Sequence, residues 1–194
     1  MNLNIDEVRA AVMAFVFAHL QAQTFAMPMY EVELVAALTQ SQKDALAFAI
    51  TEIHSSKFTT PKLFVNVKIT DARKQETYVA GRPRPSNRIT AHVRTSASRT
   101  QQDFDQLCND IHVAWSSIVH PGHPTKPPPD EELRAIFIFG DIVAAWEAGF
   151  AVPTAGHDAE WARENMGAFK EKAQDGDEDF ADLIDELSER DEFK

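Results

Sequence analysis

The strongest constraint on the fold is an order of strand, helix and strand that occurs twice between residues 29 and 139. In each copy, apolar residues recur at helical spacing between two runs that are typical of strands. Thr39 and Gln42 form a possible capping box before the first helix. The expected elements are strands at 29–38 (with a turn), 63–69, 88–94 and 134–139, and helices at 41–54, 104–118 and 141–148.

These two β-α-β units predict an α+β fold. A connection long enough to contain a helix can return the second strand of each unit parallel to the first. Two such units side by side form one four-stranded mixed sheet with two helices on one face. Strands this apolar cannot leave the other face in water, so we expect other subunits to cover it.

The segments outside this pattern divide the chain into three parts. Residues 1–27 are interpreted as an N-terminal extension, in which an amphipathic helix is expected over 5–20. Residues 28–169 form the predicted domain, and residues 170–194 form an acidic tail. One weak helix around Phe180 to Leu187 is expected in the tail, and much of the tail is expected to be disordered.

The charge of the chain is distributed unevenly. The whole chain has 30 acidic and 19 basic residues, yet residues 57–99 carry ten basic and two acidic side chains. A basic stretch in an acidic protein favours a small anion in a pocket over nucleic acid, which the remaining chain would repel. A solvated basic face is the alternative interpretation.

Two further counts limit the location of the protein. No apolar run approaches the roughly 18 residues that a membrane span needs, so no membrane partner is expected. The single cysteine, Cys108, excludes an internal disulfide and indicates a reducing compartment, which we take to be the cytoplasm.

The chain has no phosphate loop, no glycine-rich dinucleotide turn and no paired Cys-x-x-Cys. The informative stretches are Met27-Pro28-Met29-Tyr30, Ala49-Ile50-Thr51-Glu52-Ile53-His54, His92-Val93-Arg94 with Arg99, Phe137-Ile138-Phe139-Gly140-Asp141, Glu147-Ala148-Gly149 and Gly156-His157-Asp158-Ala159-Glu160-Trp161. In this order and with these gaps, residues 28–166 resemble the tautomerase superfamily. The chain is most similar to the branch that contains cis-3-chloroacrylic acid dehalogenase and its fungal relatives.

The resemblance implies an enzyme without cofactor or metal that acts on a small anionic organic acid and assembles as a homotrimer. Family members begin at a free proline that acts as general base or acid, and Pro28 matches that position. His54 matches a histidine at a helix end that helps hold the substrate or its leaving group. Glu147 matches a glutamate that activates water in the dehalogenases.

The resemblance also implies residues that bind the substrate. Arg94 and Arg99 match two arginines that clamp a carboxylate, although they lie five residues apart here and three apart in the relatives. Tyr30 matches a tyrosine two residues after the proline. The relatives have another tyrosine where this chain has Ile138. Each role has a structural alternative, because His54 could cap a helix, the arginines could lie on the surface, and Glu147 could be a solvated acid.

Pro28 can act as a base only if its nitrogen is free. Inside a peptide bond the nitrogen is an amide without a basic lone pair. A terminal amine has a pKa of about 8, and burial beside arginines lowers it further. We therefore expect the functional chain to start at Pro28, either because translation starts at Met27, which is then removed, or because a protease removes the extension.

The predicted function is a cofactor-independent tautomerase or isomerase of a small keto or unsaturated carboxylic acid, with Pro28 as general base. One alternative is a hydratase or hydrolytic dehalogenase in which Glu147 activates water. Another is a non-catalytic interaction protein in which the extension blocks Pro28.

Overall fold

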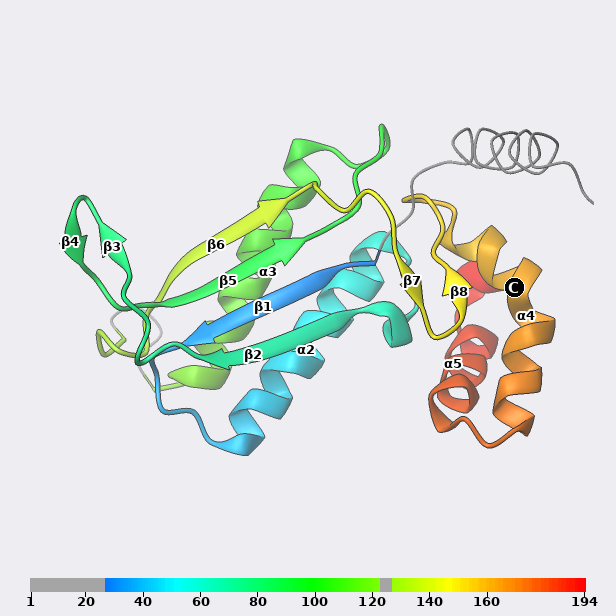
Figure 1. Ribbon diagram of the computed structural model, residues 1–194, viewed down its shortest axis with the longest axis horizontal. Helices are drawn as coiled ribbons and strands as arrows, with labels where there is room; N and C mark the ends of the chain where they lie inside the picture. Colours follow the sequence, from blue (N-terminus) through cyan, green and yellow to red (C-terminus); the bar gives the residue numbers. More distant parts are fainter. Residues whose placement is uncertain (1–26, 123–126) are drawn as a thin grey trace, which may run out of the picture.

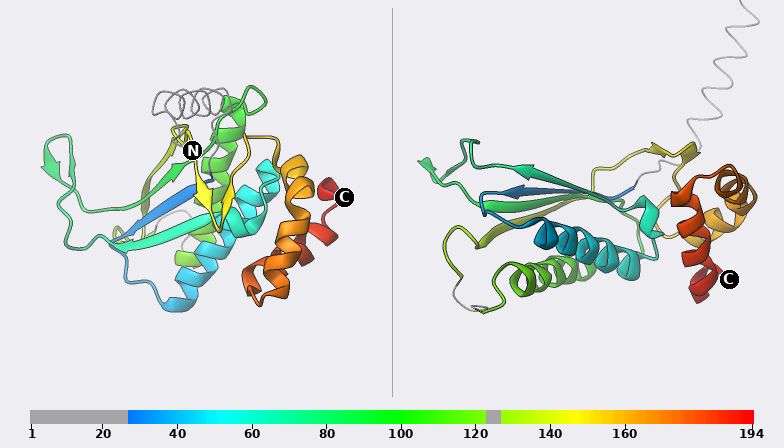
Figure 2. Two further views of the ribbon diagram at one scale, coloured as in Figure 1. Left: turned by 45° about the vertical axis from the view of Figure 1, so that its right-hand side comes forward. Right: turned by 90° about the horizontal axis from the view of Figure 1, so that it is seen from below.

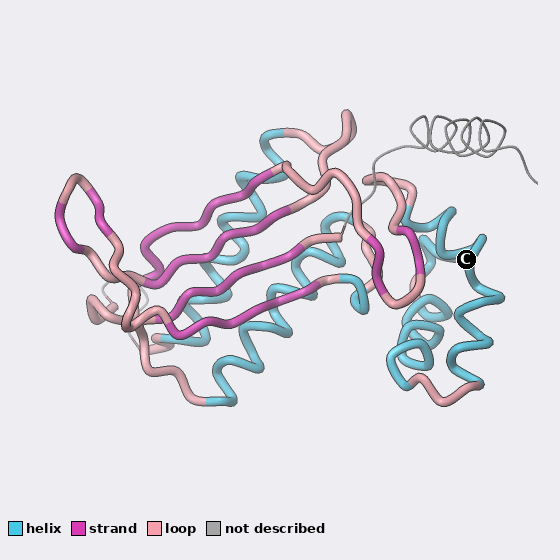
Figure 3. Tube along the Cα trace, in the orientation of Figure 1, coloured by secondary structure: helices cyan, strands magenta, loops and turns pink. Residues whose placement is uncertain are grey.

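The computed structural model describes residues 27–122 and 127–194, and the helix expected within residues 5–20 lies outside the described part. Figure 1 shows one sheet with two long helices, followed by a pair of helices at the end of the chain. Figure 3 separates the helices, strands and loops by colour. The elements in chain order are β1 (Met29–Leu34), α2 (Gln40–Phe58), η1 (Lys62–Phe64), β2 (Asn66–Asp71), β3 (Tyr78–Val79), β4 (Arg82–Pro83), β5 (Asn87–His92), α3 (Gln101–Val119), β6 (Leu133–Phe139), β7 (Trp146–Glu147), β8 (Phe150–Ala151), α4 (Asp158–Gln174), α5 (Glu178–Glu189) and η2 (Asp191–Phe193).

The main sheet has four strands in the order β2-β1-β5-β6. Strands β1 and β2 are parallel, β5 and β6 are parallel, and β1 pairs antiparallel with β5. Each parallel pair is joined through a helix, so the tandem β-α-β arrangement and the mixed sheet are confirmed. Helices α2 and α3 lie side by side on one face of this sheet, as the view from below shows (Figure 2).

Local sequence signals account for both long helices. Thr39 and Gln42 form the predicted capping box of α2, and Thr100 and Asp103 form an equivalent one for α3. Helix α2 runs to Phe58, one turn beyond the predicted end, and stops at Thr59, which adopts a left-handed conformation with φ 55°. Its inward face and that of α3 pack on β1 and β5, forming the main core around Trp115.

The predicted helix over residues 141–148 is wrong. The segment is a loop that leads into β7, and β7 pairs with β8 as a short hairpin. Ala148 and Gly149 both have positive φ, at 50° and 96°. Such a pair forms a tight hairpin turn, and a helix cannot continue through two left-handed residues.

The expectation of a largely disordered tail is also wrong. Helix α4 runs across residue 170, and α5 packs against α4 as an antiparallel pair (Figure 1). Both helices contribute to a second buried group, which we call the C-terminal cluster. Its members are Met27, Phe64, Val152, Ala162, Phe169, Phe180, Leu183, Leu187 and Phe193.

The sheet face opposite α2 and α3 carries exposed apolar side chains. Met29 is 38% exposed, Phe137 48% and Phe139 46%. Phe139 stacks on His92 of the neighbouring strand, with ring centroids 5.5 Å apart. Among the residues that the structure describes, none of the helices has the length and hydropathy to cross a membrane.

Candidate functional site

Pro28 lies directly before the central strand β1 and is buried. Its carbonyl oxygen accepts a hydrogen bond from the backbone N–H of Asn66, at 3.1 Å. This bond continues the parallel ladder in which Met29 is paired with Asn66. Pairing within the sheet therefore determines the position of Pro28, at the end of the sheet where β1 and β2 begin.

Glu147 belongs to the β7–β8 hairpin, and its side chain lies at the same end of the sheet, beside Asn66. The side-chain amide of Asn66 donates to both carboxylate oxygens of Glu147, at 3.2 and 3.1 Å. Partial burial raises the pKa of Glu147, and the hydrogen bond from Asn66 opposes this effect. Asn66 thus connects the backbone of Pro28 with the carboxylate of Glu147, a link that no sequence pattern indicated.

Tyr30 and His54 form a buried pair on the helix-covered face of the sheet. The Tyr30 hydroxyl lies 2.7 Å from Nδ1 of His54, and both side chains are fully buried. Burial raises the pKa of Tyr30, whereas burial and the charges of Arg99 and Arg94 lower the pKa of His54. Both groups are therefore neutral at pH 7.

We assign Tyr30 as the donor, because a phenol is the more acidic partner and imidazole is the more basic one. His54 then carries its proton on Nε2, which has no hydrogen-bond partner among the described residues. His54 also stands within α2, five residues before the C-cap Thr59, so the helix-cap alternative does not describe it. A buried N–H without a partner is unusual in a folded protein, and on this assignment it belongs to a side chain that is fully buried.

Arg94 is buried rather than exposed, with 3% of its surface accessible. Its guanidinium donates to the Pro153 carbonyl at 2.7 Å, to the Thr60 hydroxyl at 3.1 Å and to the Asp158 carboxylate at 2.6 Å. The alternative that placed Arg94 on the surface is therefore wrong. The predicted role of Arg94 in binding a substrate carboxylate did not include this ion pair with a carboxylate of the protein itself, Asp158.

Arg99 is the second arginine of the predicted clamp, and unlike Arg94 it forms no ion pair with a carboxylate among the described residues. It donates to the Arg94 carbonyl at 3.0 Å, and its guanidinium carbon lies 4.3 Å from the centre of the Phe58 ring. Burial and the charge of Arg94 lower the pKa of Arg99 to about 10, so it stays a cation at neutral pH. Arg99 lines a pocket of about 280 Å³ together with Lys57 and Asp158.

The predicted site residues therefore form two groups. Pro28 and Glu147 lie at the start of β1 and β2 and are connected through Asn66. Tyr30, His54, Arg94 and Arg99 lie between the sheet and the end of α2, where Asp158 and Thr60 join them. Asp158 belongs to the stretch Gly156 to Trp161, but no motif or spacing in the sequence indicates that it pairs with Arg94.

Ile138 occupies the β6 position where relatives have a tyrosine. It pairs with Ala91 across the sheet and packs on the main core. The position contributes hydrophobic packing and no hydroxyl group.

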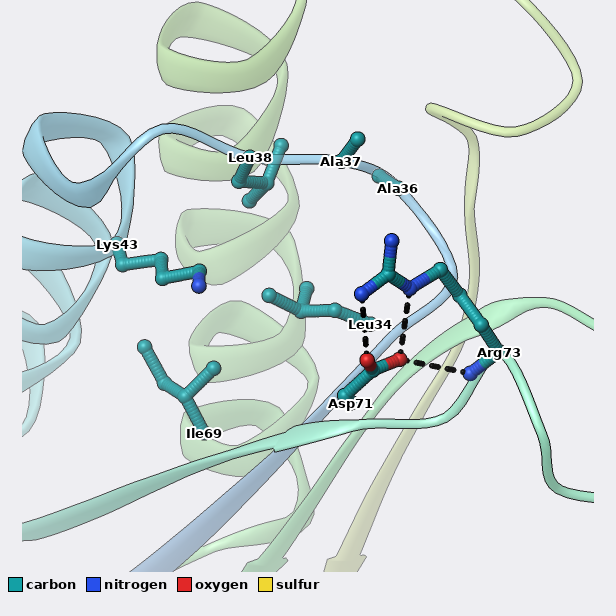
Figure 4. A pocket seen from close by; sticks show the side chains of 8 residues that line it. All are labelled: Leu34, Ala36, Ala37, Leu38, Lys43, Ile69, Asp71 and Arg73. Carbon is teal, nitrogen blue, oxygen red and sulfur yellow. Dashed lines mark hydrogen bonds and ion pairs between the residues drawn. The ribbon is translucent and has the colours of Figure 1, made fainter.

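A further pocket lies at the opposite end of β1 and has a volume of about 360 Å³. Figure 4 shows Lys43 beside the aliphatic side chains of Leu34, Leu38 and Ile69, with Arg73 bound to Asp71 at the rim. Pro28 precedes β1 and Leu34 ends it, so this pocket is separated from Pro28 by the length of the strand. None of the predicted site residues lines it.

Comparisons with solved structures place the fold. The chain is similar to N1, a member of the cis-3-chloroacrylic acid dehalogenase family, with 24% identity over 80% of this chain and 99% of N1, and a TM-score of 0.52. It is also similar to a probable enzyme from the thermophilic fungus Aspergillus fumigatus, with 20% identity, 72% and 95% coverage and a TM-score of 0.52. RhCC from Rhodococcus jostii RHA1 shows 20% identity, 71% and 96% coverage and a TM-score of 0.50.

Sequence comparisons assign the family. No curated protein sequence matches the chain. The family model described as "Putative oxalocrotonate tautomerase enzyme" matches residues 27–166, which is most of the chain. The resemblance to the tautomerase superfamily is confirmed by this family model, and the fold is shared with a member of the cis-3-chloroacrylic acid dehalogenase family. The chain therefore belongs to the Tautomerase_3 family.

Proposed function

We propose that the protein is a cofactor-independent tautomerase or isomerase of a small keto or unsaturated carboxylic acid, active when Pro28 is the first residue. The observation that carries this proposal is the placement of Pro28, buried at the start of the central strand and hydrogen-bonded to Asn66. A terminal amine has a pKa of about 8, and burial lowers it, so the free amine is available at neutral pH.

Each remaining residue has a role in this proposal. The Pro28 amine removes a proton from the carbon next to a carbonyl and returns it to another atom of the enol system. The Arg99 cation attracts the substrate carboxylate, and Nε2 of His54 donates a hydrogen bond to an oxygen that becomes negative. Tyr30 fixes the His54 ring, and Arg94 orients Arg99 through its backbone carbonyl.

Hydration or hydrolytic dehalogenation of an unsaturated acid is the second candidate. It is favoured by the raised pKa of Glu147 and by the contact of Glu147 with Asn66 beside Pro28. A carboxylate with a raised pKa is a stronger base toward water. The missing hydroxyl at Ile138 argues against this candidate.

The assembly and location of the protein are part of the same proposal. A homotrimer would cover the exposed side chains of Met29, Phe137 and Phe139 on the open face of the sheet. The single cysteine supports a reducing compartment such as the cytoplasm. Light scattering that gives the mass of a monomer would contradict the assembly.

Activity assays on the same protein samples test the proposed chemistry. A chain that begins at Pro28 is expected to convert phenylenolpyruvate to the keto form, and the same chain with the 27-residue extension is expected to be inactive. Release of halide from 3-haloacrylates, without activity on phenylenolpyruvate, would select the second candidate. Equal activity with and without the extension would refute the role of Pro28, and inactivity of both would support a non-catalytic interaction protein.

A further inference from the structure

The pocket at the end of β1 opposite Pro28 contains one positive charge that no carboxylate among its lining residues balances. Its charged residues are Lys43, Asp71 and Arg73. The Arg73 guanidinium donates to both carboxylate oxygens of Asp71, at 2.9 and 2.6 Å, and the Arg73 backbone N–H donates to the same carboxylate at 3.0 Å. These bonds lower the pKa of Asp71, so Asp71 stays ionised and bound to Arg73. The charges of this pair cancel, and the charge of Lys43 remains on the other side of the pocket (Figure 4).

Lys43 differs from the other partly buried lysines in the described part of the chain. Lys57 and Lys62 each form an ion pair with a carboxylate. Lys172 lies over an aromatic ring, 5.1 Å from its centre. Lys43 is also partly buried, yet it forms neither an ion pair nor a cation–π contact with the described residues. An ammonium group that has lost part of its water and has no counter-charge favours the binding of an anion.

The remaining walls of this pocket are apolar and are held in place by hydrogen bonds. They come from β1, β2 and the loop between β1 and α2, and they consist of Leu34, Ala36, Ala37, Leu38 and Ile69. The side-chain oxygen of Asn87, which is fully buried, accepts hydrogen bonds from the backbone N–H groups of Val35 and Ala36, both at 2.9 Å. On the other side, the backbone N–H of Ala72 donates to the Leu34 carbonyl at 2.8 Å. Because these bonds fix both sides, the pocket is preformed.

We propose that this pocket, here called the Lys43 pocket, binds a small aliphatic carboxylate. The carboxylate lies against the ammonium group of Lys43, and the alkyl chain lies over Leu34, Leu38 and Ile69. A single cation with an apolar lining suits such a monoanion better than phosphate, which needs several donors. The volume of about 360 Å³ is the share of roughly twelve water molecules in the liquid, so an acid of the size of hexanoate fits. The length of β1 separates this site from Pro28, so binding does not depend on the proposed function.

Titration of the full-length chain with hexanoate, followed by ¹H–¹⁵N NMR, tests the proposal. We expect saturable shifts in the backbone signals of Ala36, Leu38 and Ile69. Acetate lacks most of the alkyl chain, and each buried methylene group contributes about fourfold in affinity, so acetate should bind at least about tenfold more weakly. Hexan-1-ol lacks the charge and should also bind at least about tenfold more weakly. Absence of saturable shifts with hexanoate, or equal affinity for acetate or inorganic phosphate, would overturn the proposal.

Two lysine variants test which cation holds the carboxylate. Lys43→Met removes the charge and keeps an unbranched side chain, so it should weaken hexanoate binding at least about tenfold and leave hexan-1-ol binding unchanged. Lys68→Met is the matched control. Lys68 directly precedes Ile69 on β2, so its side chain points to the opposite face of the sheet, where it pairs with Glu31 at 3.2 Å. Equal losses of hexanoate affinity in the two variants, or no loss in Lys43→Met, would overturn the role of Lys43.

Discussion

Asp158→Asn is expected to be among the most destabilising conservative substitutions in this protein. The Asp158 carboxylate lies 2.6 Å from a guanidinium nitrogen of Arg94, and each side chain is only 3% exposed. Removing one partner of such a pair leaves an uncompensated buried charge, which costs about 3–5 kcal/mol. The free energy of unfolding should fall by that amount, as measured by urea denaturation followed through tryptophan fluorescence.

Asp71→Asn provides the matched control for this substitution. Asp71 lies at the same 2.6 Å from a guanidinium nitrogen of Arg73, but the two side chains are 56% and 60% exposed. Water screens exposed pairs, so the control should leave the urea midpoint nearly unchanged. A replacement of both buried partners, Arg94→Met with Asp158→Leu, should recover much of the lost stability. Equal midpoints for Asp158→Asn and Asp71→Asn would refute the reasoning.

Three further outcomes follow from the contacts described above. The pKa of His54 is lowered in the folded state, so below about pH 6.5 the unfolded chain binds one more proton than the folded chain, and the unchanged protein should lose up to about 1.4 kcal/mol of stability per pH unit. His54→Asn removes this group, so the free energy of unfolding of the variant should depend less on pH. Phe180→Ala should cost about 3–5 kcal/mol in urea denaturation, because Phe180 is 1% exposed, and no loss would mean that the tail does not support the fold. Under the proposed function, Arg99→Gln should lower kcat/KM about 10- to 100-fold, whereas Arg99→Lys should retain more activity, and equal effects would show that the positive charge is unimportant.

The fold could be predicted to the extent that its signals are local. Thr39 with Gln42 defines the start of α2 within four residues, and the apolar stripes of both long helices depend only on neighbours along the chain. The prediction of a helix over residues 141–148 was wrong because the composition of this segment also suits a helix, whereas Ala148 and Gly149 turn the chain into a hairpin. The prediction of a disordered tail was wrong because the few apolar residues of the tail, such as Phe180, are buried against residues that are distant in the sequence.

The candidate site could be predicted only where the family pattern names a residue. Pro28, His54 and Glu147 come from that pattern, and the structure reveals what surrounds them. Asn66 connects to Glu147 across 81 positions, and Arg94 to Asp158 across 64. No periodicity or spacing signal encodes such contacts, because they depend on which strand ends and loops the fold brings together.

The mass of the active protein tests the central claim most directly. The protein is purified from its native source by following activity on phenylenolpyruvate, and the intact mass of the active fraction is measured. A free Pro28 amine requires the mass of a chain whose first residue is Pro28. An active fraction whose mass still includes Met27 would contradict the account, because its Pro28 nitrogen would be an amide.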